Sequence, residues 1–585
     1  MIAYLPLILI FSVGWFLNDP VSLIGVAVAS IFTLLTTILE KSQIRFLNLG
    51  SILLILLFLC MSVSTIYNKV NLEAALLGLY QHNFGLILWL ILPLIYNLIR
   101  SNSSAQNKLF NFTFPAMLLF SVLYGTLQVY SIDPLPWTNQ YDAVQLTLGN
   151  PNFASSLIGM LLIVPISEIF QKKNRLIFNL LLVAISIFVM YNCKSLQGFF
   201  VMIISIIVYF ATKNKYLFSK NYTRLSRFLF YILFMLFSIV AILFWRIPFF
   251  QNLKAKIFYE GNIEQRLDYW RTGLSIFNDN VVLGVGPDQL GRFSGLYRDT
   301  NQVIRDGEFV LPDKSHNLLI DIFANGGIFA GLFFLGFITY IFCVIFKKIN
   351  VDMTPSRRDI FAKSSAIWSG YLFQALISPD KILLLIIGIS CAAVVVSDRG
   401  VDDASSLHTK NSRDEKEALI VKIVATCLII PLIFFWNRSI ATDYLARKII
   451  VSEGIDVLTM NRFIQMTYSP KVTEEILVKA VNSGINCYQI NQIASRLIII
   501  DDRSAQGWFA RAICQNQKKD FGSALSSLEQ SLKFDPLNPT YLSARVKLAI
   551  ASDEKKLAEN YLSNLRTYFP EHDEIEKLQD SINLL

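Results

Sequence analysis

The residues of this 585-residue chain best suited to chemistry are a histidine and an arginine in one polar stretch. His316 directly precedes an almost uninterrupted apolar run, residues 318–346, and Arg266 lies earlier in the stretch. An imidazole, with a reference pKa of about 6.5, accepts a proton near neutral pH, and a guanidinium binds phosphate groups through paired hydrogen bonds. A base and an anion-binding group at the mouth of a membrane helix would form half of an active site that faces water.

The segment between these two residues predicts how they are positioned. Residues 262–277 have the apolar periodicity of an amphipathic helix, which would carry Arg266 and Arg271. Gly284 and Gly286, followed by proline, then predict a tight turn. We therefore expect a short surface helix and a turn to bring the arginine toward the histidine.

Composition places these residues on a membrane protein. Hydrophobic residues make up 54% of the chain and charged residues only 16%, which is far too apolar for a soluble protein. The fold class that we predict is all-α, a polytopic bundle of about 12–13 membrane helices. The candidate spans are residues 2–16, 21–39, 47–67, 84–99, 112–131, 153–170, 176–191, 199–211, 228–250, 318–346, 361–377, 383–396 and 418–436.

Alternate short connections between these spans are rich in Lys and Arg, which predicts that they are cytoplasmic. The N-terminal start is then cytoplasmic, and an odd number of spans places the C-terminus outside. The loop of residues 251–317 faces outward in this arrangement. The net charge of +9 is largely this topology signal, so we expect membrane lipids and no nucleic acid as partners.

The seven cysteines form no CxxC pair, so we expect neither a metal site nor a disulfide framework. Cys487 and Cys514 lie in the C-terminal region. If that region is outside, a bridge between them is one alternative, and two buried thiols are the favoured one.

Several short motifs, none of them strong alone, together carry a family resemblance in their order and spacing. The motifs are Ser62-Val63-Ser64-Thr65, residues 78–85, Gly149-Asn150-Pro151-Asn152-Phe153, residues 195–198, Arg266-Leu267-Asp268-Tyr269-Trp270, Gly284-Val285-Gly286-Pro287, Ser315-His316-Asn317 with Gly326, Gly327 and Gly331, and residues 370–378. With these motifs in this order, the chain resembles the O-antigen ligase and polymerase superfamily of membrane glycosyltransferases.

The resemblance implies a GT-C-like bundle in a bacterial inner membrane, with its active site on the periplasmic side. The enzyme would move a glycan from an undecaprenyl-pyrophosphate donor, a lipid-linked oligosaccharide, to an acceptor hydroxyl. His316 would be the general base and Arg266 the principal pyrophosphate ligand. Further candidates are Lys194, Gln197 and Arg271 for the pyrophosphate, and His82, Asn317, Gly284 and Gly286 elsewhere in the site. We expect no cofactor and no metal, because residues 251–317 contain no DxD pair.

Two departures from the family pattern concern the donor side of the site. Family members often carry an arginine in the turn where this chain has Lys194 and Gln197, and another where it has Gln81 and His82. Because lysine is a point charge and not a planar fork, donor binding at this turn would differ in geometry.

Beyond residue 436 the chain becomes polar and repeats itself every 34 residues, which predicts a tetratricopeptide-like helical solenoid in residues 437–585. Asp501 and Asp535 are one such pair, and Ala524 and Ala558 are another. The bundle would then occupy residues 1–436. A concave helical array is a usual place to bind a protein partner.

The acceptor is left open by the motifs. It could be lipid A core, as in an O-antigen ligase, which is the interpretation that we favour. It could also be a growing glycan, as in a polymerase, or a protein, as in an O-oligosaccharyltransferase. A polysaccharide transporter is the alternative from another class, but it should carry ionisable residues at mid-membrane, and Glu73, Asp321 and Glu168 all lie near predicted helix ends.

Overall fold

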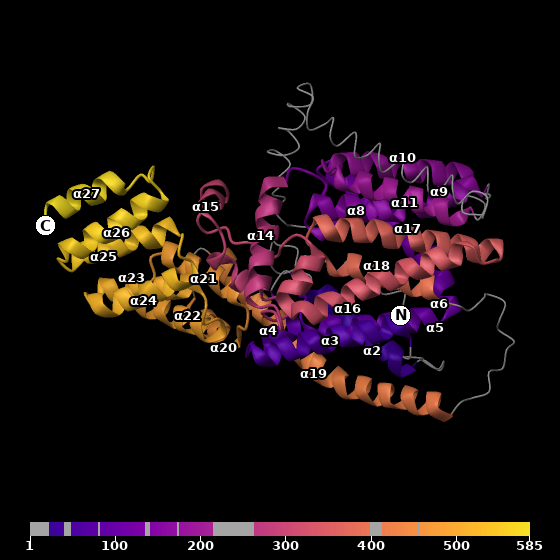
Figure 1. Ribbon diagram of the computed structural model, residues 1–585, viewed down its shortest axis with the longest axis horizontal. Helices are drawn as coiled ribbons and strands as arrows, with labels where there is room; N and C mark the ends of the chain where they lie inside the picture. Colours follow the sequence, from indigo (N-terminus) through magenta and orange to yellow (C-terminus); the bar gives the residue numbers. More distant parts are fainter. Residues whose placement is uncertain are drawn as a thin grey trace, which may run out of the picture.

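The computed structural model describes residues 23–39, 48–79, 82–134, 141–171, 175–214, 263–397, 412–452 and 456–585. Over these residues the chain forms helices and no strand, so the predicted all-α class is confirmed. Figure 1 shows a bundle and a C-terminal group of helices, with α14 and α15 between them.

The N-terminal half of the bundle is built from helices whose ends are set by asparagine caps and prolines. Asn48 and Asn150 each accept a hydrogen bond from the first turn of the following helix, and Pro151 occupies the first position of its helix. The helices are α2 (Leu23–Leu39), α3 (Leu49–Tyr67), α4 (Leu72–Leu77), α5 (Leu86–Ser101), α6 (Ser103–Lys108), α7 (Phe114–Val129), α8 (Pro151–Leu161), α9 (Ile163–Phe170), α10 (Leu176–Asn192) and α11 (Gln197–Lys213).

The second half supplies the helices that carry the predicted site. They are α14 (Ile263–Asp279), α15 (Thr300–Asp306), α16 (Leu318–Ile349), α17 (Pro355–Ile377), α18 (Ile382–Val396) and α19 (Ser412–Val451). Helix α18 is apolar on every face, and all of its residues are buried. Because a helix of that kind gains by burial on all sides, it lies in the centre of the bundle, against α5 and α17.

Five helices of the described segments are long and apolar enough to cross a membrane, which supports the predicted polytopic bundle. They are Leu49–Tyr67, Ser103–Val129, Pro151–Phe170, Leu318–Ile349 and Lys422–Val451. Five shorter apolar helices accompany them, α18 among them. The predicted spans 2–16 and 228–250 lie outside the described residues.

Helix α16 begins directly after the predicted histidine motif and is broken near its start. Gly327 has φ 77° and ψ −174°, a conformation that only glycine adopts without strain. The Ile328 N–H donates its hydrogen bond outside the helix, to the carbonyl of Val281 at 2.7 Å. At the break, the backbone of α16 is therefore hydrogen-bonded to the segment that follows α14.

The C-terminal helices recur in pairs. Helices α23 and α25 begin at Ala505 and Pro539, 34 residues apart, which is the repeat spacing that the sequence predicts. The helices are α20 (Val457–Met466), α21 (Pro470–Asn482), α22 (Cys487–Ile500), α23 (Ala505–Gln517), α24 (Phe521–Phe534), α25 (Pro539–Ala551), α26 (Lys555–Tyr568) and α27 (Ile575–Asn583). The tetratricopeptide assignment itself stays a prediction, as does the domain boundary at residue 436, which falls inside α19.

One expectation for this region is wrong. Cys487 and Cys514, which the sequence favours as two thiols, form a disulfide with Cα atoms 5.3 Å apart. The bridge joins the first turn of α22 to the end of α23. Sequence spacing could not reveal it, because the two cysteines meet only when these helices pack side by side.

The C-terminal helices are fixed to the bundle through the loop between α14 and α16. Arg298 of this loop binds Asp535 through two hydrogen bonds, 2.9 and 2.6 Å long, and both side chains are buried. Arg292 binds Asp501 at 2.6 Å. Asp501 and Asp535 are the pair spaced by 34 residues, so equivalent positions of two successive helix pairs each hold one arginine of the loop.

Candidate functional site

His316 lies at the junction between the loop that follows α14 and the start of α16, in a strained backbone conformation with φ 58°. The next residue, Asn317, caps α16 by accepting hydrogen bonds from the N–H groups of Leu319 and Ile320. Its amide nitrogen donates to the carbonyl of Leu376 at 2.9 Å. Asn317 thus ties the start of α16 to the end of α17 and fixes the position of the imidazole.

Helix α14 brings an aromatic ring and a guanidinium to this imidazole. Tyr269 packs edge-on against His316 with ring centroids 4.9 Å apart. Arg266 lies one turn earlier on the same face of α14, and its positive charge contributes to lowering the pKa of His316. Arg266 donates to the carbonyl of Ile377 at 2.9 Å, and no carboxylate among the described residues pairs with it. A partly buried cation without a counterion is suited to binding an anion.

A second histidine, His82, reaches the site from the connection between α4 and α5. The His82 Nε2 atom lies 2.7 Å from a carboxylate oxygen of Asp313, three residues before His316. Lys471 of α21 approaches the same oxygen at 3.5 Å. Burial alone would raise the pKa of Asp313. His82, through its charge when protonated and its hydrogen bond, together with the charges of Lys471 and protonated His316, holds this pKa well below its usual range.

Burial lowers the pKa of His316 and of His82 to about 4 each, although the charge of Asp313 acts in the opposite direction. Both imidazoles are therefore neutral near pH 7, the protonation state that a base requires. The Nδ1 atom of each ring is buried without a hydrogen-bond partner. Each ring thus keeps one nitrogen that is not committed to another residue.

Lys314 lies at the centre of a group of buried carboxyls. Its ammonium sits 3.4 Å from the centroid of the Phe84 ring, and its charge acts on both Asp288 and Asp380. Burial raises the pKa of Asp288 to about 6 and that of Asp380 to about 7. Asp288 accepts hydrogen bonds from the N–H groups of Leu79 and Phe84, and in this way holds the 78–85 motif against the site.

The Gly284 and Gly286 turn runs beside the break in α16 and fixes it. Val285 and Gly286 donate their N–H groups to the carbonyls of Ala324 and Asn325, at 3.0 and 2.8 Å. A Cβ atom on Gly284 would lie 2.5 Å from the Asn325 carbonyl carbon, and φ is 64° there. These glycines therefore allow two backbones to approach closely, and we assign them a positioning role.

The three other candidates for the donor site contact residues other than His316. Arg271 is exposed and binds Asp299 at 2.8 Å. Lys194 is also exposed, and its ammonium lies 3.0 Å from Asp142. Gln197 donates to the hydroxyl of Ser156 at 3.0 Å. The structure brings together His316, Arg266, Asn317 and His82, whereas these three side chains contact other partners.

Sequence reasoning missed Asp313, Asp288 and Lys471, and it noted Lys314 beside His316 without giving it a role. Asp313 lies directly before Lys314, and Asp288 immediately follows the glycine turn, so adjacency to the motifs was a usable signal for both. Lys471 had no such signal, because it reaches the site from the C-terminal helices.

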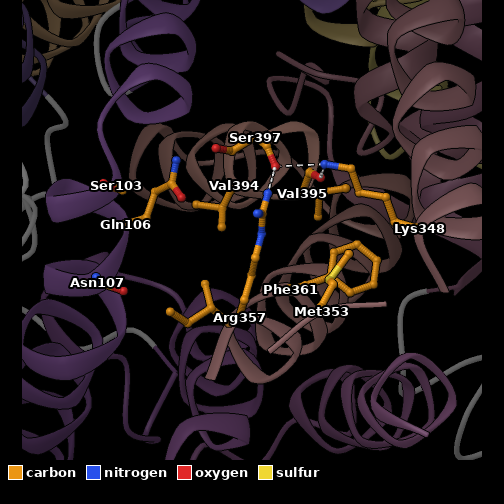
Figure 2. Close-up of a pocket in the computed structure, with 11 residues that line it drawn as sticks. Ser103, Gln106, Asn107, Lys348, Met353, Arg357, Phe361, Val394, Val395 and Ser397 are labelled. Atoms are coloured by element: carbon orange, nitrogen blue, oxygen red, sulfur yellow. Dashed lines mark hydrogen bonds between the residues drawn. The ribbon is translucent and has the colours of Figure 1, made fainter. Parts of the chain in front are cut away.

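A cavity at the other end of the bundle is not part of this site. Figure 2 shows it between α6, α16, α17 and α18, with Lys348 and Arg357 pointing toward the last carbonyls of α18. The Lys348 ammonium binds the carbonyls of Val395 and Ser397 at 3.1 and 2.8 Å. The space is about 20 Å³, roughly one water, and the two cations neutralise the negative end of a helix dipole.

Comparison with known proteins agrees with the resemblance. Residues 178–335 match the family model described as O-antigen ligase, a region that contains Lys194, Gln197, Arg266, the glycine turn and His316. No curated protein matches the chain. The family assignment made from the motifs is confirmed over this region, and it supports an enzyme of glycan transfer. This chain is accordingly a multi-pass membrane protein whose residues 178–335 match the O-antigen ligase family model.

Proposed function

We propose that this protein transfers a glycan from an undecaprenyl-pyrophosphate carrier to an acceptor hydroxyl at the periplasmic face of the inner membrane. The observation that carries the proposal is that one helix, α14, places the Tyr269 ring against His316 and the Arg266 guanidinium close enough for its charge to act on the imidazole. Both lie within the matched family region.

The chemistry follows from the charges. The acceptor oxygen attacks the anomeric carbon, the bond to the pyrophosphate breaks, and the electron pair leaves with the phosphate oxygen. Arg266 stabilises the negative charge that develops there. The hydroxyl proton passes to an imidazole nitrogen of His316.

A pKa of about 4 makes His316 neutral but weakly basic. Arrival of the anionic pyrophosphate offsets the charges of Arg266 and Lys314 and so raises this pKa toward the working range. Asp313 then stabilises the imidazolium that forms. Donor binding thereby prepares the base for the acceptor.

Two observations support the proposed orientation. The Cys487–Cys514 bridge is expected in an oxidising, extracytoplasmic compartment. The cations Lys348 and Arg357 gather at the opposite end of the bundle, where the positive-inside tendency places the cytoplasm. A reporter fused after Leu585 should behave as extracytoplasmic, and a cytoplasmic signal would place every proposed site residue in the wrong compartment.

The decisive experiment uses the full chain in lipid nanodiscs with a lipid-linked oligosaccharide donor. Lipid A core, free repeat-unit glycan and a serine-containing protein are offered separately, and the one that is glycosylated distinguishes ligase, polymerase and protein transferase. His316→Ala should reduce transfer by about 10²–10⁴-fold. Arg266→Ala should weaken donor use, with partial recovery in Arg266→Lys.

The matched controls are Arg566→Ala on α26 and His572→Ala in the connection between α26 and α27. Both variants should transfer at the rate of the unaltered chain. Arg271→Ala tests the alternative pyrophosphate ligand, because it should have a small effect if its partner is Asp299 and a large one if it binds donor. Full transfer by a stably inserted His316→Ala variant would refute the assignment of the base.

A further inference from the structure

A polar cavity of about 280 Å³ lies where the C-terminal helices meet the outer loop. Helix α21 contributes Lys471 and Glu474, and the α22–α23 connection with the start of α23 contributes Arg503 and Gln506. The loop completes the wall with residues 308–311 and Asp313. Small-molecule sites typically have volumes of about 300–1,000 Å³. The volume of this cavity is close to the lower limit, so the cavity is large enough for a compact ligand.

The polar groups of this cavity are of both kinds, donor and acceptor. Glu474 accepts a hydrogen bond from the hydroxyl of Ser504 at 2.8 Å, and burial raises its pKa to about 7, so its carboxyl exists near neutral pH in both the donating and the accepting form. Arg503 Nε and Gln506 Oε1 are buried without a hydrogen-bond partner. A hydroxyl group both donates and accepts, and a compound with several hydroxyls would satisfy this mixed set.

Apolar surface accompanies these groups. Tyr541 is buried at the cavity wall, and Phe309, which packs against it with ring centroids 6.3 Å apart, is half exposed. Aromatic faces beside a few oriented polar groups are typical of sites for ring-shaped ligands with one apolar face. This combination favours a sugar ring over an extended, strongly charged ligand.

The cavity adjoins the proposed active site through one carboxylate. Asp313 lines the cavity, and the same side chain contacts His82 at 2.7 Å and lies three residues before His316. The ion pairs of Arg292 and Arg298 with Asp501 and Asp535 hold the loop against the C-terminal helices, and so keep this wall in place.

We propose that the cavity between the outer loop and α21–α23 is the acceptor subsite and that it binds a hydroxyl-rich saccharide ring. This inference rests on the proposed transfer function and adds to it the acceptor class and the residues that bind it, chiefly Glu474 and Gln506. The C-terminal helices are thus a working part of the active site, and the transferred glycan is joined to a sugar that they hold.

Saturation-transfer NMR on the full chain in nanodiscs tests the proposal. The probes are the free repeat-unit oligosaccharide, released from its lipid, and a blocked serine-containing tripeptide. Gln506→Trp fills the cavity, and Glu474→Gln keeps its shape while removing the titrating carboxyl. Gln579→Trp and Glu576→Gln make the same substitutions on α27, away from the cavity. Thermal unfolding of each variant monitors folding, and if Gln506→Trp is unfolded the isosteric Glu474→Gln decides.

We expect the oligosaccharide, and not the tripeptide, to receive saturation from the unaltered chain and from both controls. The two cavity variants should weaken binding and raise the acceptor KM about tenfold, the equivalent of one hydrogen bond to the ligand, with the donor KM unchanged. Binding that both cavity variants retain, saturation of the tripeptide instead, or no saturation of either probe would overturn the proposal. His316→Ala should bind the oligosaccharide and fail to transfer, so continued transfer by that variant refutes the proposed function and not the cavity.

Discussion

The buried ion pair between Arg298 and Asp535 predicts how strongly the loop between α14 and α16 is held to the C-terminal helices. The side chains are 0% and 3% exposed and share two hydrogen bonds. Replacing Asp535 with asparagine leaves a buried guanidinium without its counterion, which costs about 3–5 kcal/mol. A loss of about 3 kcal/mol lowers the midpoint of thermal unfolding by roughly 6–12 °C for a domain of about 150–250 residues.

The chain contains a matched control for this substitution. Asp502 also pairs with an arginine of the loop, Arg292, at 3.1 Å, but its side chain is 81% exposed. Exposed pairs contribute about 0–1 kcal/mol because water and salt screen them. Asp502→Asn should therefore leave unfolding nearly unchanged.

Calorimetry of the full chain in nanodiscs measures both variants, and limited proteolysis of the loop between α14 and α16 reports whether this loop has detached. The double variant Arg298→Met with Asp535→Leu should recover much of the lost stability, because it removes the unpaired charge together with its partner. Equal effects of Asp535→Asn and Asp502→Asn, or a double variant as unstable as Asp535→Asn, would refute the electrostatic reasoning.

Two further predictions concern the site and the broken helix. Between about pH 6.5 and 4 the unfolded chain binds more protons at His82 and His316 than the folded chain does, so these residues reduce the free energy of unfolding as the pH falls. In a double variant, His82→Gln with His316→Gln, this fall in the free energy of unfolding should be smaller. The difference between the double variant and the unaltered chain isolates the contribution of the two imidazoles from that of buried carboxyls such as Asp380, whose raised pKa acts in the opposite direction. Gly327→Ala should destabilise the bundle by about 1–3 kcal/mol from backbone strain alone, and by more because the new Cβ would lie 2.2 Å from the Val282 carbonyl oxygen. Gly336→Ala in the same helix would make an ordinary 3.6 Å contact and should cost nothing; equal thermal stability of the two variants would contradict the role given to the break.

Much of the local structure could be predicted because its causes are local. The amphipathic helix expected over residues 262–277 is α14, Ile263–Asp279, and the apolar run after His316 is α16. Helical periodicity and the asparagine cap at position 317 act over a few residues, so they are visible in the sequence. The break at Gly327 was not predicted, because its cause is a hydrogen bond to Val281 in a different segment.

The candidate site could be predicted only in part. His316 and Arg266 were found from their motifs, whereas the partners that surround them come from distant positions. His82 meets Asp313 across 231 residues, and Lys471 meets it across 158. The disulfide of Cys487 likewise required α22 and α23 to be packed together before the two sulfurs could meet.

The sequence by itself determined the class of this protein, because hydrophobic content and helical periodicity are sums over neighbouring residues and do not depend on how the helices pack. It also determined the short motifs that resemble the O-antigen ligases. Only the tertiary structure decided which charges share a site, which glycine breaks α16, and that the C-terminal helices form a wall beside Asp313. Those outcomes depend on contacts between segments that are distant in the sequence, where burial and the loss of water set the strength of each interaction.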